Sequence, residues 1–249
     1  MLLAIDVGNT NAVFGFHAGD EWKPVWRLTT RAEATAHDWL ASLRALSPLG
    51  EALRPSKAIC ASVVPTVDAA LTAAVHDLYG IPLQFVSPES VKILHIEYEP
   101  PNAVGADRVA NAVAVRQLYG APAVVVDFGT ATTFDAVTKD AYIGGAILPG
   151  PALSMEALFH RTAKLPRVAL EAPAHAIGRT TAESIQSGLI LGYAGAIDRL
   201  TRQFVAELGN TANVVATGGL ATMFAPLCET INAVNPNLTL EGLRLIAAH

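Results

Sequence analysis

The chain has 249 residues, a formal net charge of −5, a pI near 5.8 and no run of Lys or Arg, so nucleic acid is not expected as a partner. Half of the residues are hydrophobic (51%), but charge, Gly or Pro interrupts each apolar run before the ~18 residues that a membrane span needs. No basic segment precedes Asp6, so a secretory signal is not expected and the predicted location is cytoplasmic. The two cysteines, Cys60 and Cys228, are predicted to be free buried thiols.

The first element is a predicted β-hairpin. An apolar run over residues 2–5 leads to Asp6, the turn Gly8-Asn9-Thr10 follows, and a second apolar run covers residues 12–16. The Asp6 carboxylate can hold a hydrated cation, and the backbone N–H groups after Gly8 can surround a phosphate. An ordinary hairpin with the same turn would have the same pattern, so this motif alone leaves both interpretations open.

The rest of the first half alternates strands and helices. Strands are predicted over residues 22–30, 58–64 and 83–86, and helices over residues 33–47 and 66–79, the second ending at Gly80. A loop over residues 87–102 contains Tyr98 and a Pro pair. The next predicted helix starts at Gly105 and runs to about residue 119.

Asp107, next to Arg108 at the start of that helix, has two open interpretations. It can cap the helix and offset its dipole, or it can act as a carboxylate base beside an Arg that binds an anionic substrate.

The first motif recurs near the middle of the chain. Residues 124–133 again combine an apolar run, Asp127, one residue, Gly129 and hydroxylated residues, and Asp6 aligns with Asp127 as Gly8 does with Gly129. Such repetition implies two similar domains with facing phosphate loops. We predict a boundary near Gly120, which gives domains over residues 1–119 and 120–249.

Several glycine motifs mark the second half. The segment 142–151 reads as a strand passing into a helix near a ligand or, equally well, as a structural turn. Residues 161–179 look irregular, and a helix is predicted from Thr180 or Thr181 to about residue 208. A strand over 213–216 ends at Gly218-Gly219, where a flat ligand can approach the backbone, and a last helix covers 237–245.

Taken together, these motifs resemble those of the actin, sugar kinase and heat-shock chaperone ATPase superfamily, and within it the type III pantothenate kinases. The resemblance covers essentially the whole chain and rests on the order of eight motifs: 6–10 (DVGNT), 61–65 (ASVVP), 105–108 (GADR), 127–133 (DFGTATT), 144–150 (GGAILPG), 183–188 (ESIQSG), 217–219 (TGG) and 238–243 (LTLEGL). It implies an α/β fold of two ribonuclease-H-like domains, as in actin-like ATPases, with the active site in the cleft between them.

The resemblance also implies an activity: phosphorylation of pantothenate by ATP, the first step of coenzyme A synthesis. It assigns the base to Asp107, a monovalent cation (potassium or ammonium) to Asp127, and magnesium to Asp6. Pantothenate contacts are expected at Tyr98, Gly105, Ala106, Arg108 and Thr181. ATP contacts are expected at Asp6, Gly8, Asn9, Thr10, Asn11, Gly129, Thr130, Thr132, Gly218 and Gly219. A homodimer is also implied.

One departure and two rival functions remain open. The sequence is Gly178-Arg-Thr-Thr181 where the family pattern is Gly-Lys-Asn-Thr, so Thr180 is an alternative to Thr181. Another small-molecule kinase, such as an N-acetylhexosamine kinase, would have similar phosphate loops, but a neutral sugar does not need Arg108 beside the base. A regulatory protein that has lost activity is the second rival, although Asp6, Asp107 and Asp127 are all present.

Overall fold

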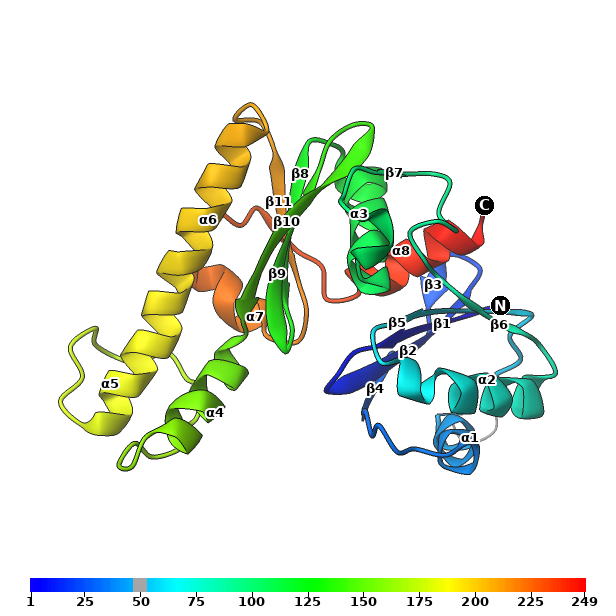
Figure 1. The fold of residues 1–249 in the computed structure, drawn as a ribbon, viewed down its shortest axis with the longest axis horizontal. Helices are drawn as coiled ribbons and strands as arrows, with labels where there is room; N and C mark the ends of the chain where they lie inside the picture. Colours follow the sequence, from blue (N-terminus) through cyan, green and yellow to red (C-terminus); the bar gives the residue numbers. More distant parts are fainter. Residues whose placement is uncertain (47–52) are drawn as a thin grey trace. The chain divides into compact units, whose positions relative to one another are not determined.

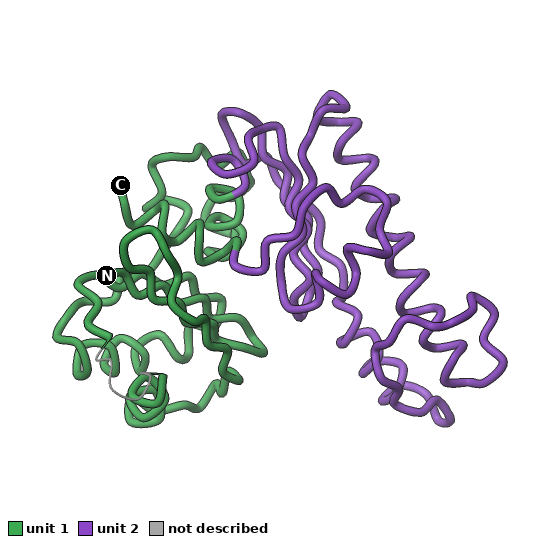
Figure 2. Tube along the Cα trace, turned by 180° about the vertical axis from the view of Figure 1, so that it is seen from behind, with its two compact units in different colours: residues 1–114, 238–249 green, residues 115–237 purple. Residues whose placement is uncertain are grey.

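The computed structural model describes residues 1–46 and 53–249, which form two compact units (Figure 1). Unit 1 contains Met1–Ala114 and Leu238–His249, and unit 2 contains Val115–Asn237 (Figure 2). Within the described ranges, no helix is both long enough and apolar enough to cross a membrane.

The sheet of unit 1 is built around the first predicted hairpin. Its order is β3-β2-β1-β5-β6, with β4 also paired to β2. β1 is antiparallel to β2 and parallel to β5, and its side chains at Leu3, Ile5 and Val7 are fully buried. The strands are β1 (Leu2–Val7), β2 (Asn11–Ala18), β3 (Glu21–Trp22), β4 (Trp26–Thr29), β5 (Lys57–Ser62) and β6 (Leu83–Phe85). The predicted strand over 22–30 is therefore two short strands.

The helices of unit 1 largely follow the sequence pattern. They are α1 (Ala36–Ala45), α2 (Pro65–Tyr79), α3 (Ala106–Tyr119, which continues into unit 2) and α8 (Leu238–Ala247). α1 begins later than predicted because Thr35 and Asp38 form a capping box, and residue 47 of that prediction lies outside the described residues. α2 ends as expected at Gly80, whose φ is +69°. The predicted loop 87–102 contains the short strand β7 (His95–Ile96) and most of the 3₁₀ turn η1 (Pro101–Ala103).

Unit 2 repeats the central arrangement of unit 1. β8 and β9 form an antiparallel pair across the second Asp-x-Gly turn, and β11 pairs with β8 in parallel, as β5 pairs with β1. The strands of unit 2 run in the order β12-β11-β8-β9-β10. They are β8 (Ala123–Phe128), β9 (Ala131–Val137), β10 (Ala141–Pro149), β11 (Asn213–Thr217) and β12 (Ala233–Val234).

A long helical segment packs against the sheet of unit 2, as Figure 1 shows. α5 (Thr181–Ser187) continues through a π-helical turn, η2 (Gly188–Gly192), into α6 (Tyr193–Glu207). Ile190 and Ile197 from this segment join Val126 and Phe134 of the sheet in one buried cluster. The other helices are α4 (Pro151–Arg161), α7 (Ala221–Phe224) and the 3₁₀ turn η3 (Ala225–Leu227). The predicted long helix is present, but the π turn was not predicted.

The last helix returns to unit 1. α8 packs against β1 and β5, and its Thr239 donates a buried hydrogen bond of 2.9 Å to Oδ1 of Asn111 in α3. Gly242 of α8 meets α3 so closely that an added Cβ would lie 2.9 Å from Cα of Ala110. The contacts thus group residues 238–249 with residues 1–114, whereas the predicted division at 119/120 groups them with the second half.

Candidate active site

The first Asp-x-Gly turn joins β1 to β2. Asp6 is partly buried at the end of β1, opposite Val13, and Asn9 and Thr10 are exposed. The turn is held by its own backbone, since Gly8 N–H donates to Asn11 O at 2.9 Å. Thr30, which follows β4, also stabilises the turn: its hydroxyl donates to Gly8 O at 2.7 Å and its N–H donates to Thr10 O at 2.9 Å. The turn is therefore a fixed loop with an acid at its base.

Asp107 and Arg108 stand in the first turn of α3. Oδ1 of Asp107 accepts a 2.8 Å hydrogen bond from Arg108 N–H, a backbone donor of the first helical turn. Burial raises the pKa of the Asp107 carboxyl, and the hydrogen bond and charge of Arg108 oppose that shift only in part. Arg108 itself is buried, with 7% of its surface exposed. A carboxylate with a raised pKa beside a buried cation suits proton transfer, so the cap and the base are compatible roles.

The segment after β1 and the start of α3 both lie next to Val63, the residue that follows β5. Val63 N–H donates to Val7 O at 3.0 Å, which ties the segment after β5 to the segment after β1. A Cβ built on Gly105 would lie 3.6 Å from Cγ1 of the same Val63. The end of β1 and the start of α3 therefore lie on either side of Val63. Unit 1 therefore places the segments that carry Asp6 and Asp107 next to the same residue, Val63.

The second Asp-x-Gly turn joins β8 to β9 in unit 2. Gly129 N–H donates to Ala131 O, two residues ahead, at 3.1 Å, whereas in the first turn Gly8 N–H donates to Asn11 O, three residues ahead. Gly129 and Thr130 are exposed. Gly150, just before α4, lies against this turn: its N–H donates to Thr130 O at 3.0 Å, and an added Cβ would lie 2.6 Å from Gly129 O. Only Gly fits there, so the Pro-Gly-Pro segment shapes the loop.

Asp127 lies between two neighbouring strands. It pairs with Thr133 of β9 and with Thr217 of β11. Gly218 follows Thr217 with φ +90°, and an added Cβ would meet Oδ1 of Asp127 and lie 2.7 Å from backbone atoms of Phe128. Gly218 is therefore in close contact with the end of β8, directly before the second Asp-x-Gly turn.

The two hydroxyls Thr130 and Thr132 differ in accessibility. Thr130 is exposed in the turn, whereas Thr132 is fully buried on β9 and pairs with Phe128. Paired residues share a face of the sheet, so Thr132 lies on the core face. Of the two predicted phosphate contacts, Thr130 has the accessible position.

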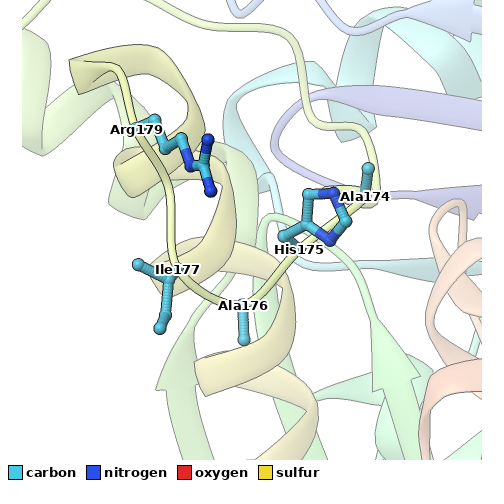
Figure 3. Close-up of a pocket in the computed structure, with 5 residues that line it drawn as sticks. All are labelled: Ala174, His175, Ala176, Ile177 and Arg179. Atoms are coloured by element: carbon cyan, nitrogen blue, oxygen red, sulfur yellow. The ribbon is translucent and has the colours of Figure 1, made fainter.

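The segment before α5 is attached to the start of that helix by a capping hydrogen bond. Thr180 is the N-cap, its hydroxyl accepting from Glu183 N–H at 3.2 Å, and Thr181 is the first helical residue. Residues 174–177 and Arg179 line an open hollow of about 540 Å³; in Figure 3 the Arg179 side chain points into the bend of this segment and Ile177 points outward. The hydroxyl of Thr180 is engaged by the cap, and Thr181 is exposed.

Sequence comparison identifies the family. The family model for type III pantothenate kinases matches residues 2–203. A type III pantothenate kinase of Moorella thermoacetica is 46% identical over 249 residues, covering 99% of this chain and 98% of that protein. One of Thermomicrobium roseum is 46% identical over 250 residues, covering 98% and 95%. The chain belongs to the type III pantothenate kinase family.

Solved structures support the fold of this family member. A Campylobacter jejuni protein assigned to the Baf family of transcriptional activators superposes with a TM-score of 0.62 at 20% identity, covering 99% of this chain and 97% of that one. The ethanolamine utilization protein EutJ of Carboxydothermus hydrogenoformans superposes with a TM-score of 0.52 at 16% identity, covering 98% and 89%. At these identities the likeness concerns the fold alone, and it agrees with the predicted two-domain actin-like architecture.

The structure adds residues that the sequence analysis did not assign to the site of this kinase. In unit 1, Thr30 bonds to the first Asp-x-Gly turn and Val63 lies next to the start of α3. In unit 2, Gly150 bonds to the second Asp-x-Gly turn. Thr133 is partly buried beside Asp127, and the fully buried Asp135 accepts its hydroxyl at 3.2 Å. The run of hydroxylated residues over 130–133 indicated that Thr133 could belong to the site. Only the strand register, which pairs Thr133 with Asp127 and Thr132 with Phe128, shows which of the two threonines lies beside Asp127. Tyr98 is partly buried between β7 and η1.

Proposed function

We propose that this chain transfers the γ-phosphoryl group of ATP to the terminal hydroxyl of pantothenate, the first step of coenzyme A synthesis. The observation that carries the proposal is 46% identity to type III pantothenate kinases over essentially the full chain. The duplicated Asp-x-Gly turn, once in each unit, supports it because phosphoryl transfer depends mostly on positioning and charge stabilisation.

Asp107 is the proposed general base. The hydroxyl oxygen of pantothenate attacks the γ-phosphorus, the bond from that phosphorus to the β,γ-bridging oxygen breaks, and the hydroxyl proton passes to Asp107. A base is most effective when its pKa approaches the working pH. The raised pKa of Asp107 supports this role, and its bond to Arg108 N–H fixes the carboxylate.

Pantothenate carries a carboxylate, and the proposed partner for it is Arg108, which can bind it through two N–H groups. Gly105 and Ala106 at the start of α3 are further proposed contacts, and Gly105 also leaves room for the Asp107 carboxylate, since an added Cβ would lie 2.5 Å from its Oδ1. The proposed further contacts are Tyr98 and Thr181. Between the alternatives Thr180 and Thr181, the structure favours Thr181, because the Thr180 hydroxyl already caps α5.

ATP is proposed to bind through the two turns. Backbone N–H groups of such turns hold phosphate oxygens. The proposed contacts are Asp6, Gly8, Asn9, Thr10, Asn11, Gly129, Thr130, Gly218 and Gly219. Thr132, which was also predicted, has a fully buried side chain, so its proposed role is to support the turn from the core face.

The residues present fit the two cations. Asp6 offers a partly buried carboxylate at the base of an exposed turn, which suits a hydrated magnesium ion that supplies charge neutralisation at the phosphates. Asp127 offers one carboxylate with neutral oxygen neighbours on both adjacent strands, which suits potassium or ammonium. A monovalent cation there supplies positive charge beside the second turn.

Mass spectrometry of a reaction containing purified protein, ATP, magnesium and pantothenate tests the proposal. The expected product is pantothenate with one added phosphate, formed together with ADP and faster with potassium than with sodium. Asp107→Asn is the matched control, which should bind ATP normally and form product about 10²- to 10⁴-fold more slowly. Absence of product when ATP binds normally would refute the assignment.

A homodimer and a cytoplasmic location are further proposals that rest on the family resemblance. Exposed apolar side chains of unit 2, at Ile147 (64% exposed) and Leu153 (48% exposed), support self-association. Sedimentation equilibrium measures the assembly, and a monomer at micromolar concentration would contradict it.

A further inference from the structure

A buried acid lies next to the second phosphate turn and takes no part in the proposed chemistry. Asp135 of β9 has no exposed surface. It accepts hydrogen bonds from Thr133 Oγ1 at 3.2 Å and from the hydroxyl of the fully buried Tyr142 at 3.1 Å. We call Thr133, Asp135 and Tyr142 the Asp135 network. A buried carboxylate is costly unless it is well bonded, and these two hydroxyl donors supply such bonds.

Strand register places this network beside Asp127. Thr133 is the direct partner of Asp127 across the β8–β9 pair, so the two side chains share one face with Cβ atoms ~5 Å apart. Asp135 lies two residues further along β9, on the same face. On the other side of Asp127, the close approach of Gly218 limits where the carboxylate can lie. The Thr133 hydroxyl and the Asp127 carboxylate are thus neighbouring oxygens on one surface.

The hydrogen bond to Asp135 determines which part of the Thr133 hydroxyl is available to a ligand. A hydroxyl has one proton and two acceptor lone pairs. Because the proton is donated to Asp135, the lone pairs are left for a cation. A carboxylate and a neutral hydroxyl form a donor set with a single negative charge. This set fits a monovalent cation better than a divalent one.

We infer that Thr133 is a second oxygen ligand of the monovalent cation at Asp127, and that Asp135 is a positioning residue that fixes the direction of the Thr133 hydroxyl. This inference rests on the cation role proposed for Asp127. Outer-shell hydrogen bonds orient ligands in this way, and their loss typically weakens metal affinity by about 10- to 100-fold.

The test compares Thr133→Val, which removes the hydroxyl at nearly constant volume, with Thr133→Ser, which keeps it. Thr201→Val is the matched control, since Thr201 is also buried in unit 2 and its hydroxyl has no hydrogen-bond partner among the described residues. Two quantities are measured: the potassium concentration for half-maximal kinase activity, and the rise in Tm of the ligand-free protein with potassium, with choline as the inert cation.

Thr133→Val is expected to raise the half-maximal potassium concentration about 10-fold or more in both assays, with kcat at saturating potassium nearly unchanged. Thr133→Ser and Thr201→Val should behave like the wild type. Asp135→Asn should shift the potassium dependence in the same direction as Thr133→Val; if that variant does not fold, the two Thr133 variants still decide the question.

An unchanged potassium dependence in Thr133→Val would overturn the inference. So would a wild-type enzyme that phosphorylates pantothenate without any response to potassium, and that result would leave the kinase assignment intact. If the wild type makes no product, the proposed function fails, and the Tm measurement still tests the cation site.

Discussion

Replacement of Gly242 by Ala probes the contact that holds α3 in place. The added Cβ would lie 2.9 Å from Cα of Ala110 and closer still to the carbonyl group of that residue. These are backbone atoms of a helix, so no side-chain rotation relieves the clash. One of the two helices must move, and α3 carries Asp107 at its start.

The magnitude follows from three terms. Overpacking of this kind typically costs about 1–3 kcal/mol. Separation of the helices also weakens the buried hydrogen bond from Thr239 to Asn111, which contributes about 1 kcal/mol. The better helix propensity of Ala returns about 1 kcal/mol. The free energy of unfolding of unit 1 should therefore fall by about 1–3 kcal/mol, and kcat should fall with it because Asp107 is displaced.

Urea unfolding measures this change. Trp22, Trp26 and Trp39 are the three tryptophans of the chain and all lie in unit 1, so their fluorescence reports on that unit, while circular dichroism follows both. Gly195→Ala in α6 is the control: nothing lies within 4 Å of its added Cβ, so it should gain roughly 0.5–1 kcal/mol. If Gly242→Ala proves as stable as this control, the packing argument is wrong.

Four other substitutions probe the site. Asp107→Asn should lower kcat by about 10²- to 10⁴-fold; an unchanged kcat would leave Asp107 only a cap. Because burial raises the pKa of Asp107, wild-type kcat/KM should fall on acidification at a higher pH than an ordinary Asp would give. The folded state binds this proton more tightly than the unfolded state, so its stabilising effect is complete at low pH and is lost as pH rises through the raised pKa. Asp107→Asn should thus unfold at no lower Tm than wild type at pH 8, and a large drop would contradict the burial argument. Gly218→Ala should raise the KM for ATP, since φ is +90° and the Cβ meets Asp127; normal ATP kinetics would show that the turn yields. Thr180→Ala should destabilise α5 by about 1 kcal/mol, and Thr181→Ala should raise the KM for pantothenate; the reverse pattern would favour Thr180 as the contact.

Much of the fold was predictable because local signals and burial agreed. The hairpins at Asp6 and Asp127, the end of α2 at Gly80 and the strand before Gly218 each follow from apolar runs and glycine punctuation. The short strands β7 and β12 were missed because two-residue pairings leave no periodicity. The return of α8 to unit 1 was also missed, since an amphipathic helix does not reveal which sheet it will cover.

Less of the candidate site than of the fold could be predicted from the sequence. The motifs identified Asp107 and Asp127 as candidates, but the raised pKa of Asp107 could not be predicted, because it depends on how deeply the folded chain buries the carboxyl. Thr132 and Thr133 are adjacent and chemically identical in the sequence. Strand register turns one toward the core and places the other beside Asp127, and a one-residue shift would exchange them.

The position of α8 in the chain also affects how the protein is made. During translation α3 leaves the ribosome before the rest of unit 2, and the helix that packs on Ala110 follows only after residue 237. Until then, the surface of unit 1 that α8 covers is open. A nascent chain that has not yet reached α8 therefore lacks the helix that packs on α3 next to Ala110.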